Sequence, residues 1–381
     1  MNRKEYLTIS FGVAFVWFTT QFGGGFASGA QLLVYFVNFG IWTLITPILA
    51  QAMGAFFQWY GLRYAYRHKT YDYRSFTDSF FGKYKNIFSN LYEVVYICLI
   101  CLAPSVAFAT GGSTLNELAG IPYIICTLII GIAIFALTIF GTEMVRKAAS
   151  TISIIIIVGL LCVYIPNIFA QWGTISENIS VMAATPAPLF PALKQCFLYG
   201  AFQLASIGLF MQHAKSFTDE SQAKKSMVFG FLINASVIFM CTIGMIAIIN
   251  NPQLHEVSVP TLLLVKTGVG STFLTPVISV LIIMGAISTA VNMIAGVVAR
   301  YVHTLEKNET KEVANSKRKK RTIVIALIAD VLAFSIAQFG LIPLIAKGYG
   351  YLGYLTIVVI VIPFIVHMIV NRGKTVKTEG E

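Results

Sequence analysis

Four glycines lie in the stretch Phe22-Gly-Gly-Gly-Phe-Ala-Ser-Gly29, inside an apolar segment that runs from Leu7 to Phe39. Each glycine costs a helix roughly 1 kcal/mol relative to alanine, so this stretch predicts a break in the helix. In lipid, the N–H and C=O groups that a break frees have no water to bond, so a break persists only where protein or a cavity surrounds it. The pattern therefore indicates a binding site built from backbone groups within a membrane span.

An alternative interpretation of the same glycines needs no break. Gly25 and Gly29 are four residues apart, which is the small-xxx-small spacing through which membrane helices pack closely. Gly23 and Gly24 lie on other faces of such a helix and are not needed for that packing. Their presence favours the break.

Residue patterns that carry enzymatic chemistry are missing from the sequence. It contains no metal-ligand cluster, no phosphate-binding loop and no serine nucleophile motif. Cys98 and Cys101 have CxxC spacing, but they lie in an apolar segment without a second pair, so packing explains them better. We expect no enzyme and no cofactor. An intramembrane enzyme would have to rely on Asp330 or Glu93.

The composition is that of a membrane protein. The 381 residues are 57% hydrophobic and 11% charged, with a mean hydropathy of +0.77. Apolar runs of about twenty residues are typical of membrane-spanning helices. We predict an all-α integral membrane protein with about ten transmembrane helices, at residues 8–39, 41–66, 88–114, 121–141, 148–172, 190–213, 223–250, 272–305, 321–338 and 340–371.

The lysines and arginines support this count. With ten spans and a cytoplasmic N-terminus, the protein lies in the cell membrane with both termini in the cytoplasm. All basic residues except Lys194, Lys266 and Lys347 then fall on the cytoplasmic side. This is the distribution that the positive-inside rule predicts. The net charge of +11 is thereby explained without a nucleic-acid partner. Residues 306–320 are predicted to form a flexible cytoplasmic loop near anionic lipid headgroups.

The ten spans divide into two halves of similar length, residues 1–185 and 186–381. Because five is an odd number, the second half enters the membrane from the opposite side, which is the condition for inverted repeats. This symmetry predicts that span six is interrupted where span one is, and the stretch from Tyr199 to Gln203 lies at the matching place. Two interrupted spans predict a substrate site between them, near the bilayer midplane.

The stretch from Phe22 to Gln31 resembles the first-helix signature of the YkvI-type bacterial membrane proteins, which belong with the amino acid–polyamine–organocation superfamily. The resemblance covers the whole chain as one transport domain, 1–381, including Ser288 and Thr289 in span eight and the glycine-rich stretch 346–353. It implies the LeuT-like fold of 5+5 inverted repeats, with discontinuous helices one and six. It also implies secondary transport of an amino acid or a related small zwitterion or organic cation.

The resemblance assigns roles at both predicted breaks. N–H groups in the break of span one would bind a carboxylate, and carbonyls freed near Tyr199 and Phe202 would accept from an ammonium group. Tyr199 and Phe202 could instead serve packing, whereas the buried amide of Gln203 needs a partner. The implied substrate contacts are Gly23, Gly24, Gly25, Phe26, Ser28, Gly29, Tyr199, Phe202 and Gln203.

The coupling ion of such a transporter could be Na⁺ or H⁺, and the sequence offers candidate residues for each. In sodium-dependent relatives, carbonyls of the first break and two hydroxyls of the eighth span bind the ion, and Ser288 and Thr289 match that arrangement. Helical serine and threonine often bond to their own backbone instead. Asp330 and Glu93 are the carboxylates within predicted spans and the candidate proton carriers. An interfacial structural role is the alternative, above all for Glu93.

Two functions follow from the sequence. The first is a secondary transporter that works by alternating access. The second is a membrane receptor that binds a small amino-acid-like ligand in the same pocket without transport, as germinant-receptor subunits of the superfamily are thought to do. Both functions call for a small-molecule ligand and the lipid bilayer as partners, and neither calls for an obligate protein partner.

Overall fold

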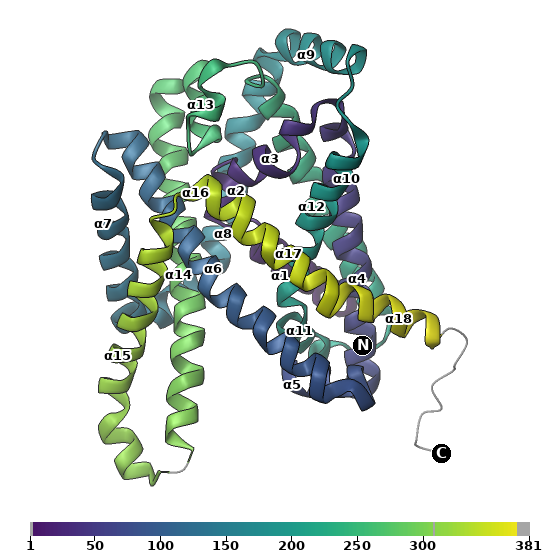
Figure 1. Cartoon of the computed structure of the whole chain (residues 1–381), viewed down its shortest axis with the longest axis vertical. Coiled ribbons are helices and arrows are strands. Elements are labelled where there is room, and N and C mark those ends of the chain that lie inside the picture. The colour runs from purple at the N-terminus through teal and green to yellow at the C-terminus, as the bar shows by residue number, and fades with distance from the viewer. Residues whose placement is uncertain (1–2, 308, 372–381) are drawn as a thin grey trace.

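The computed structural model describes residues 3–307 and 309–371, with the side chains of all of these except 3, 4, 141–150 and 153. The basic side chains of Arg146 and Lys147, and those beyond residue 371, therefore lie outside the described part. Within that part the chain consists of helices and the turns between them, as predicted (Figure 1).

The first half of the chain contains one broken helix and four long ones. Span one is divided among α1 (Arg3–Gln21), α2 (Gly24–Ala27) and α3 (Ala30–Tyr35), and the other spans are α4 (Thr46–His68), α6 (Lys85–Ala119), α7 (Tyr123–Ala136) and α8 (Thr142–Ala170). A 3-10 turn at Val37–Leu44 precedes α4, and a π-helical turn at Leu137–Gly141 follows α7. Two short helices follow spans two and five, namely α5 (Tyr73–Phe81) and α9 (Trp172–Ala184).

The second half begins with a span that changes helix type. Span six consists of α10 (Leu189–Gln203), a 3-10 turn at Leu204–Ser206 and α11 (Ile207–Phe210). The following helices are α12 (Ser221–Ile246), α13 (Pro260–Thr267), α14 (Ser271–Glu306) and α15 (Lys311–Ala337). Span ten runs through α16 (Leu341–Pro343), α17 (Gly350–Thr356) and α18 (Ile362–Val370), with π-helical turns at Leu344–Tyr349 and Ile357–Val361. Its glycine-rich start is therefore part of the span.

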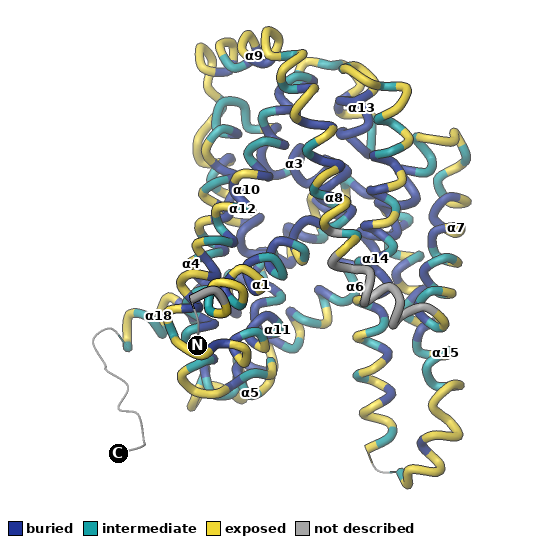
Figure 2. The backbone as a smooth tube through the Cα atoms, turned by 180° about the vertical axis from the view of Figure 1, so that it is seen from behind, coloured by how far each residue is buried: buried dark blue, intermediate teal, exposed yellow. Residues whose placement is uncertain are grey.

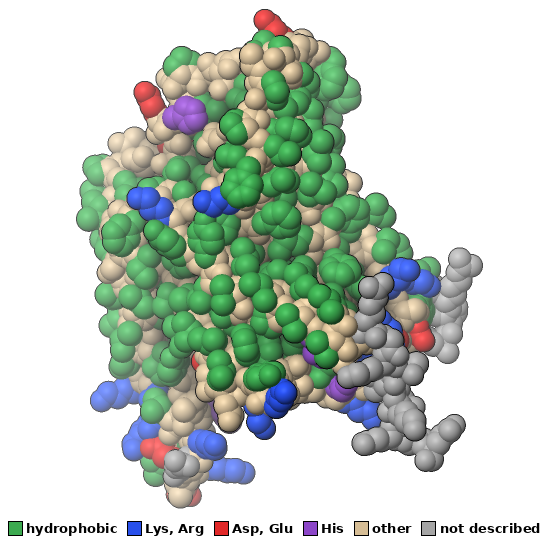
Figure 3. Space-filling view, turned by 45° about the vertical axis from the view of Figure 1, so that its right-hand side comes forward, with side chains coloured by type: hydrophobic (Ala, Val, Ile, Leu, Met, Phe, Trp, Pro, Cys, Tyr) green, Lys and Arg blue, Asp and Glu red, His purple; other side chains and the backbone are tan. Residues whose placement is uncertain are grey.

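The exposed surface is apolar enough to identify a multi-pass membrane protein. Five helices of the described chain are long and apolar enough to cross a membrane, or seven if each of two bent pairs counts as one span. Spans one, six and nine are the predicted spans that fall outside this count. Span one is broken, span six changes helix type, and span nine begins within α15, whose first turns are basic. Hydrophobic side chains cover the middle of the face that Figure 3 shows. Large hydrophobic side chains of the described chain are exposed, among them Phe140, Phe169 and Phe190.

The ends of the helices alternate as ten crossings require. The helices α9 and α13 lie at one end of the molecule, which we call the α9 end (Figures 1 and 2). The helices α5 and α11 and the turn from α14 to α15 lie at the opposite end, the α5 end. In Figure 3, the visible lysine and arginine side chains gather mainly at the α5 end.

The prediction of a flexible loop at 306–320 is wrong for most of that range, because α15 begins at Lys311. Acidic residues before this helix pair with its basic first turns. Arg321 donates a hydrogen bond of 2.7 Å to Glu309, and Lys317 lies 3.3 Å from the same carboxylate. The hydrogen bond from Arg321 lowers the pKa of Glu309 to about 2. These pairs support a helical hairpin where composition alone indicated a loop.

The break in span one fits against α14 through a glycine. A Cβ on Gly24 would lie 2.5 Å from the backbone nitrogen of Ala286 and 2.7 Å from the carbonyl oxygen of Ile282. Backbone atoms cannot move aside as a flexible side chain can. Only glycine at position 24 therefore allows α2 to pack directly on α14.

We expect Gly24→Ala to lower the stability of the protein by about 1–3 kcal/mol, because the added methyl group overpacks the contact between α2 and α14. The matched control is Gly12→Ala in α1, where a Cβ meets nothing within 4 Å. It should leave the stability unchanged or raise it by up to about 1 kcal/mol. Thermal unfolding in detergent measures both, and equal melting temperatures for the two variants would contradict the close packing.

Candidate functional site

The predicted break of span one is confirmed, since α1 ends at Gln21 and the chain continues as the single turn of α2. The carbonyl of Gly23 accepts hydrogen bonds of 3.1 Å from the N–H groups of Phe26 and Ala27. The first N–H groups of a helix have no acceptor inside it, and that of Gly25 has no backbone acceptor in the described chain. The N–H of Phe26, expected to bind a ligand, is thus already bonded, and Gly25 supplies a free donor.

Ser28 and Gly29 shape the break from behind. Gly29 has a φ of 81°, and a Cβ there would lie 2.8 Å from Oγ1 of Thr261 in α13. The N–H of Thr261 donates a 3.0 Å hydrogen bond to the carbonyl of Ser28. The Ser28 hydroxyl in turn donates to the carbonyl of Gly25 at 2.8 Å. Their geometry supports anchoring of the break to α13 rather than the predicted substrate contact.

The interruption of span six lies just after the predicted stretch. Tyr199 to Gln203 are α-helical, so their carbonyls are not freed as expected. The chain tightens to a 3-10 turn at the next three residues, and the hydroxyl of Tyr92 in α6 satisfies this turn. That hydroxyl donates to the carbonyl of Ala205 at 3.1 Å and accepts from the N–H of Gly208 at 2.8 Å. The carbonyls of Tyr199–Phe202 thus belong to a continuous helix, and those of Ala201 and Phe202 accept hydrogen bonds at its end.

The interruptions of spans one and six meet at one cavity of about 420 Å³. Its walls come from spans one, two, three, five, six, eight and ten. Of the predicted site residues, those that line it are Gly23, Gly24, Gly25, Phe26, Phe202, Gln203, Ser288 and Thr289. Ser28, Gly29 and Tyr199 lie behind the wall.

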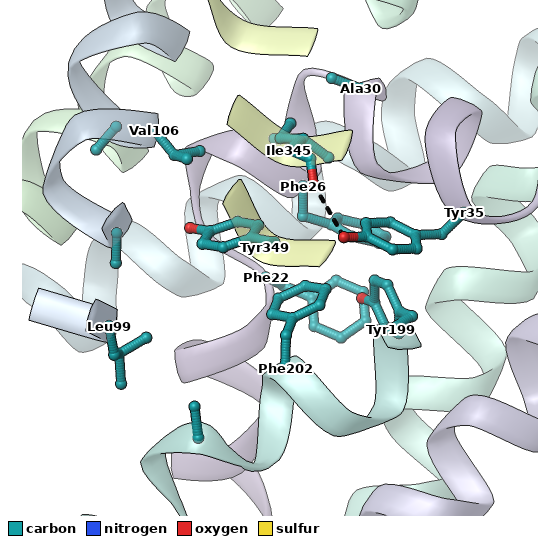
Figure 4. Close-up of a cluster of buried hydrophobic side chains, with 14 of the residues drawn as sticks. Phe22, Phe26, Ala30, Tyr35, Leu99, Val106, Tyr199, Phe202, Ile345 and Tyr349 are labelled. Carbon is teal, nitrogen blue, oxygen red and sulfur yellow. Dashed lines mark hydrogen bonds between the residues drawn. The ribbon is translucent and has the colours of Figure 1, made fainter. Parts of the chain in front are cut away.

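Aromatic side chains from spans one, six and ten pack together beside the break (Figure 4), and Phe202 and Tyr349 among them line the cavity. The rings of Phe202 and Tyr349 stack with centroids 4.6 Å apart and an angle of 8°. Behind them, the ring of Tyr199 packs against that of Tyr35 with centroids 5.4 Å apart, which supports the packing alternative for Tyr199. The hydroxyl of Tyr35 donates to the carbonyl of Ile345 at 2.9 Å, which ties span one to span ten. We call these four rings the aromatic roof.

The cavity opens in the opposite direction. Thr20 of α1, Gln212 at the end of span six and Asn292 of α14 line it and are exposed. All three lie on the α5 side of the breaks, whereas the rings of the aromatic roof are buried. The structure therefore has a site that is closed toward the α9 end and accessible from the α5 end.

The wall of the cavity carries amides and no formal charge. Among the described residues that line it there is no aspartate, glutamate, lysine or arginine, and a histidine, His213, is present. Within the described ranges, no group of three histidine, cysteine or acidic side chains could hold a metal ion. Six carboxamides line the wall, at Gln21, Gln31, Gln58, Gln203, Gln212 and Asn292. Of these, only Gln203 was predicted from the sequence, although an amide within any apolar span carries the same signal.

The two hydroxyls proposed for Na⁺ differ in their contacts. Thr289 Oγ1 donates to the carbonyl of Gly285 at 2.8 Å, which is the back-bonding alternative. The same oxygen lies 2.8 Å from the position that a Cβ on Gly23 would take. Ser288 is 9% exposed, lines the cavity, and has no described hydrogen-bond partner. Both side chains thus adjoin the break, and Ser288 has the free hydroxyl.

Glu93 takes part in an ion-paired cluster between α5, α6 and α14. It pairs with Arg300 and accepts a hydrogen bond from the hydroxyl of Tyr73. The guanidinium of Arg300 also lies over the rings of Tyr73 and Tyr96, at 5.4 and 5.3 Å. The cluster does not line the cavity. Its geometry supports the interfacial role that was the alternative for Glu93.

Asp330 lies away from the cavity, in α15. It is 7% exposed, and neither carboxylate oxygen has a hydrogen-bond partner among the described residues. Ala326 and Ala333 are buried on the same face of α15, which packs against α6, α7 and α14. A role in proton transfer for this residue stays a prediction, and it would act outside the cavity.

No family model and no curated protein matches this sequence, whereas solved structures match almost the whole chain. A Na⁺-coupled sialic acid symporter in a substrate-bound, outward-open state is 14% identical, with a TM-score of 0.51 over 93% of this chain and 86% of that one. A mutant of the manganese transporter of Eremococcus coleocola is 12% identical, with a TM-score of 0.51 over 99% and 91%. The fold is LeuT-like. The YkvI-type resemblance stays a prediction.

We expect Asp330→Asn to leave ligand binding unchanged and to maintain or raise the melting temperature, because an unpaired buried carboxyl group destabilises a protein. Glu93→Gln is the comparison, and it should lower the melting temperature by breaking the pair with Arg300. Thermal unfolding with and without ligand measures both effects. A loss of ligand binding in Asp330→Asn alone would contradict the separation of Asp330 from the site.

Proposed function

We propose that this protein is a secondary transporter of an amino acid or a related small zwitterion, working by alternating access. The observation that carries this proposal is that the interruptions of spans one and six meet at one cavity, which is closed toward the α9 end and open toward the α5 end. A rigid channel would be open at both ends. A site accessible from one side at a time is what alternating access requires.

The chemistry of the cavity suits a zwitterion. The free N–H of Gly25 can donate to a carboxylate, and the neighbouring side chain of Gln31 adds a second donor, since its Nε2 lies 3.4 Å from the Cβ position of Gly25. An ammonium group would be bound by amide and hydroxyl oxygens and by the faces of Phe202 and Tyr349, through a cation–π interaction. A divalent transition metal would find no carboxylate or thiolate ligands there. An organic substrate is therefore favoured over a metal ion.

We assign the α5 end to the cytoplasm, because the basic side chains gather there and the positive-inside rule makes that face cytoplasmic. Both termini then lie in the cytoplasm, and the cavity of this structure is open to the cytoplasm. Na⁺ is the proposed coupling ion, with Ser288 as its first ligand and Thr289 as its second. Both lie beside the break, whereas Asp330 and Glu93 do not line the cavity.

We expect Gly25→Pro to abolish amino-acid uptake into proteoliposomes, because proline removes the N–H at the break and alters the backbone before it. Gly25→Ala keeps the N–H but brings a methyl group within 3.3 Å of Val106 and 3.4 Å of Gln31, so uptake should weaken without being lost. Gly296→Ala, with no atom within 4 Å of the new Cβ, should transport normally. Normal uptake by Gly25→Pro would contradict the proposed site. Ligand-induced thermal stabilisation without any flux would favour the receptor alternative.

We expect Ser288→Ala to reduce strongly the Na⁺ dependence of uptake, and the double variant Ser288→Ala with Thr289→Ala to remove it. Thr289→Ala alone should have a smaller effect, because its hydroxyl is bonded to the carbonyl of Gly285. The measurement is the initial uptake rate at several Na⁺ concentrations, with K⁺ keeping the ionic strength constant. An unchanged Na⁺ dependence in the double variant would overturn the coupling assignment.

A further inference from the structure

Three glutamines of the cavity wall are buried with unpaired oxygens. Gln21 is 7% exposed, Gln31 is 6% exposed and Gln58 is 2% exposed. In each of them, the carboxamide oxygen is buried and has no hydrogen-bond partner among the described residues. An unsatisfied buried polar group is costly, and in a membrane no bulk water relieves it. All three line the cavity, so a polar ligand there could satisfy them.

These amides lie on both sides of the break and on the helix beside it. Gln21 precedes the break at the end of α1, and Gln31 follows it in α3. The Nε2 atom of Gln21 lies 3.9 Å from the Cβ position of Gly54 in α4. Gln58 is one helical turn beyond Gly54, on the same face of α4. Gln21 therefore lies where side chains of α1 reach α4, and both Gln21 and Gln58 line the cavity.

We propose that Gln21 and Gln58 bind the side chain of the substrate, and that the substrate is an uncharged amino acid whose side chain can both donate and accept hydrogen bonds, such as a carboxamide or a hydroxyl. This inference rests on the proposed function and adds a substrate class to it. A carboxamide complements another carboxamide, since each has a donor and an acceptor. Gln31 remains with the carboxylate end, next to Gly25.

The absence of charge excludes the other amino-acid classes. A cationic or anionic side chain would enter a cavity whose described wall has no acidic residue, lysine or arginine to pair with it. An apolar side chain would leave the buried amide oxygens unpaired. Sites built to hydrogen-bond a substrate reject analogues that lack the polar group far more strongly than apolar pockets reject an added one.

The chain offers a matched control in α4. Gln51 is 1% exposed, and both polar atoms of its amide are unpaired among the described residues. It lies two turns before Gln58 on the same helix but does not line the cavity. A substitution there removes a buried amide of the same kind without changing the site.

The first test is competition against uptake of radiolabelled L-glutamine by the wild-type protein in proteoliposomes, with L-leucine, L-glutamate and L-lysine as competitors. We expect each competitor to be at least about 10-fold weaker than unlabelled L-glutamine. Competition by L-leucine equal to that by L-glutamine would overturn the proposed substrate class while leaving transport intact. Uptake of labelled L-leucine, L-glutamate or L-lysine in place of L-glutamine would do the same. Failure to take up any of the four would instead contradict the proposed function itself.

The second test uses variants of the two glutamines. Gln21→Leu and Gln58→Leu should reduce the preference for L-glutamine over L-leucine by about 10-fold or more, while Gln51→Leu should keep it. Neither Gln21→Leu nor Gln58→Leu should unfold the protein, because each removes an unpaired buried polar group. Gln58→Glu adds a carboxylate of nearly the same shape, and it should admit L-lysine as a substrate. An unchanged preference in Gln58→Leu, or no L-lysine uptake by a folded Gln58→Glu, would overturn the proposal.

Discussion

A chain that unwinds inside a bilayer must give every backbone group that it frees either a protein partner or a place at a cavity, and this constraint organises the molecule. In span one, the carbonyl of Gly23 accepts hydrogen bonds from two N–H groups of the next turn, and the N–H of Thr261 in α13 donates to the carbonyl of Ser28. In span six, the single hydroxyl of Tyr92 serves both a carbonyl and the N–H of Gly208. What is left unpaired, such as the N–H of Gly25, faces the cavity. The free backbone groups and the cavity therefore arise from the same break.

The same partners explain why one end of the cavity is closed. Thr261 holds the break against α13, on the α9 side, and the hydroxyl of Tyr35 holds α3 against span ten. The aromatic roof fills the space between these contacts. On the α5 side, the ion pair of Glu93 with Arg300 joins α6 to α14 without crossing the cavity. Opening the α9 end would require these hydrogen bonds and the stacked rings to separate.

Much of this architecture could be predicted from composition, charge and the glycines of span one, because lipid makes long apolar helices and basic cytoplasmic turns nearly obligatory. The place of the second interruption could not be predicted, because Tyr92 stabilises it from another helix. Gly200, the glycine in the predicted stretch, lies within the regular helix α10 and does not mark the interruption. The anchoring role of Ser28 and Gly29 depends on Thr261, more than two hundred residues away in the sequence. The unpaired glutamines were visible as amides in apolar spans, but only the fold shows which of them face the cavity.

The broken first span is proposed to form a binding site for a small zwitterion. The most direct measurement is the thermal unfolding of the purified wild-type protein against a panel of amino acids, dicarboxylates and divalent metal ions, each in Na⁺ and in K⁺. A ligand at 100 times its Kd stabilises a protein by about 2.7 kcal/mol. We expect a clear rise in melting temperature with a neutral polar amino acid, larger in Na⁺ than in K⁺. Stabilisation by a divalent metal ion or a dicarboxylate, with no shift from any amino acid in either salt, would contradict it.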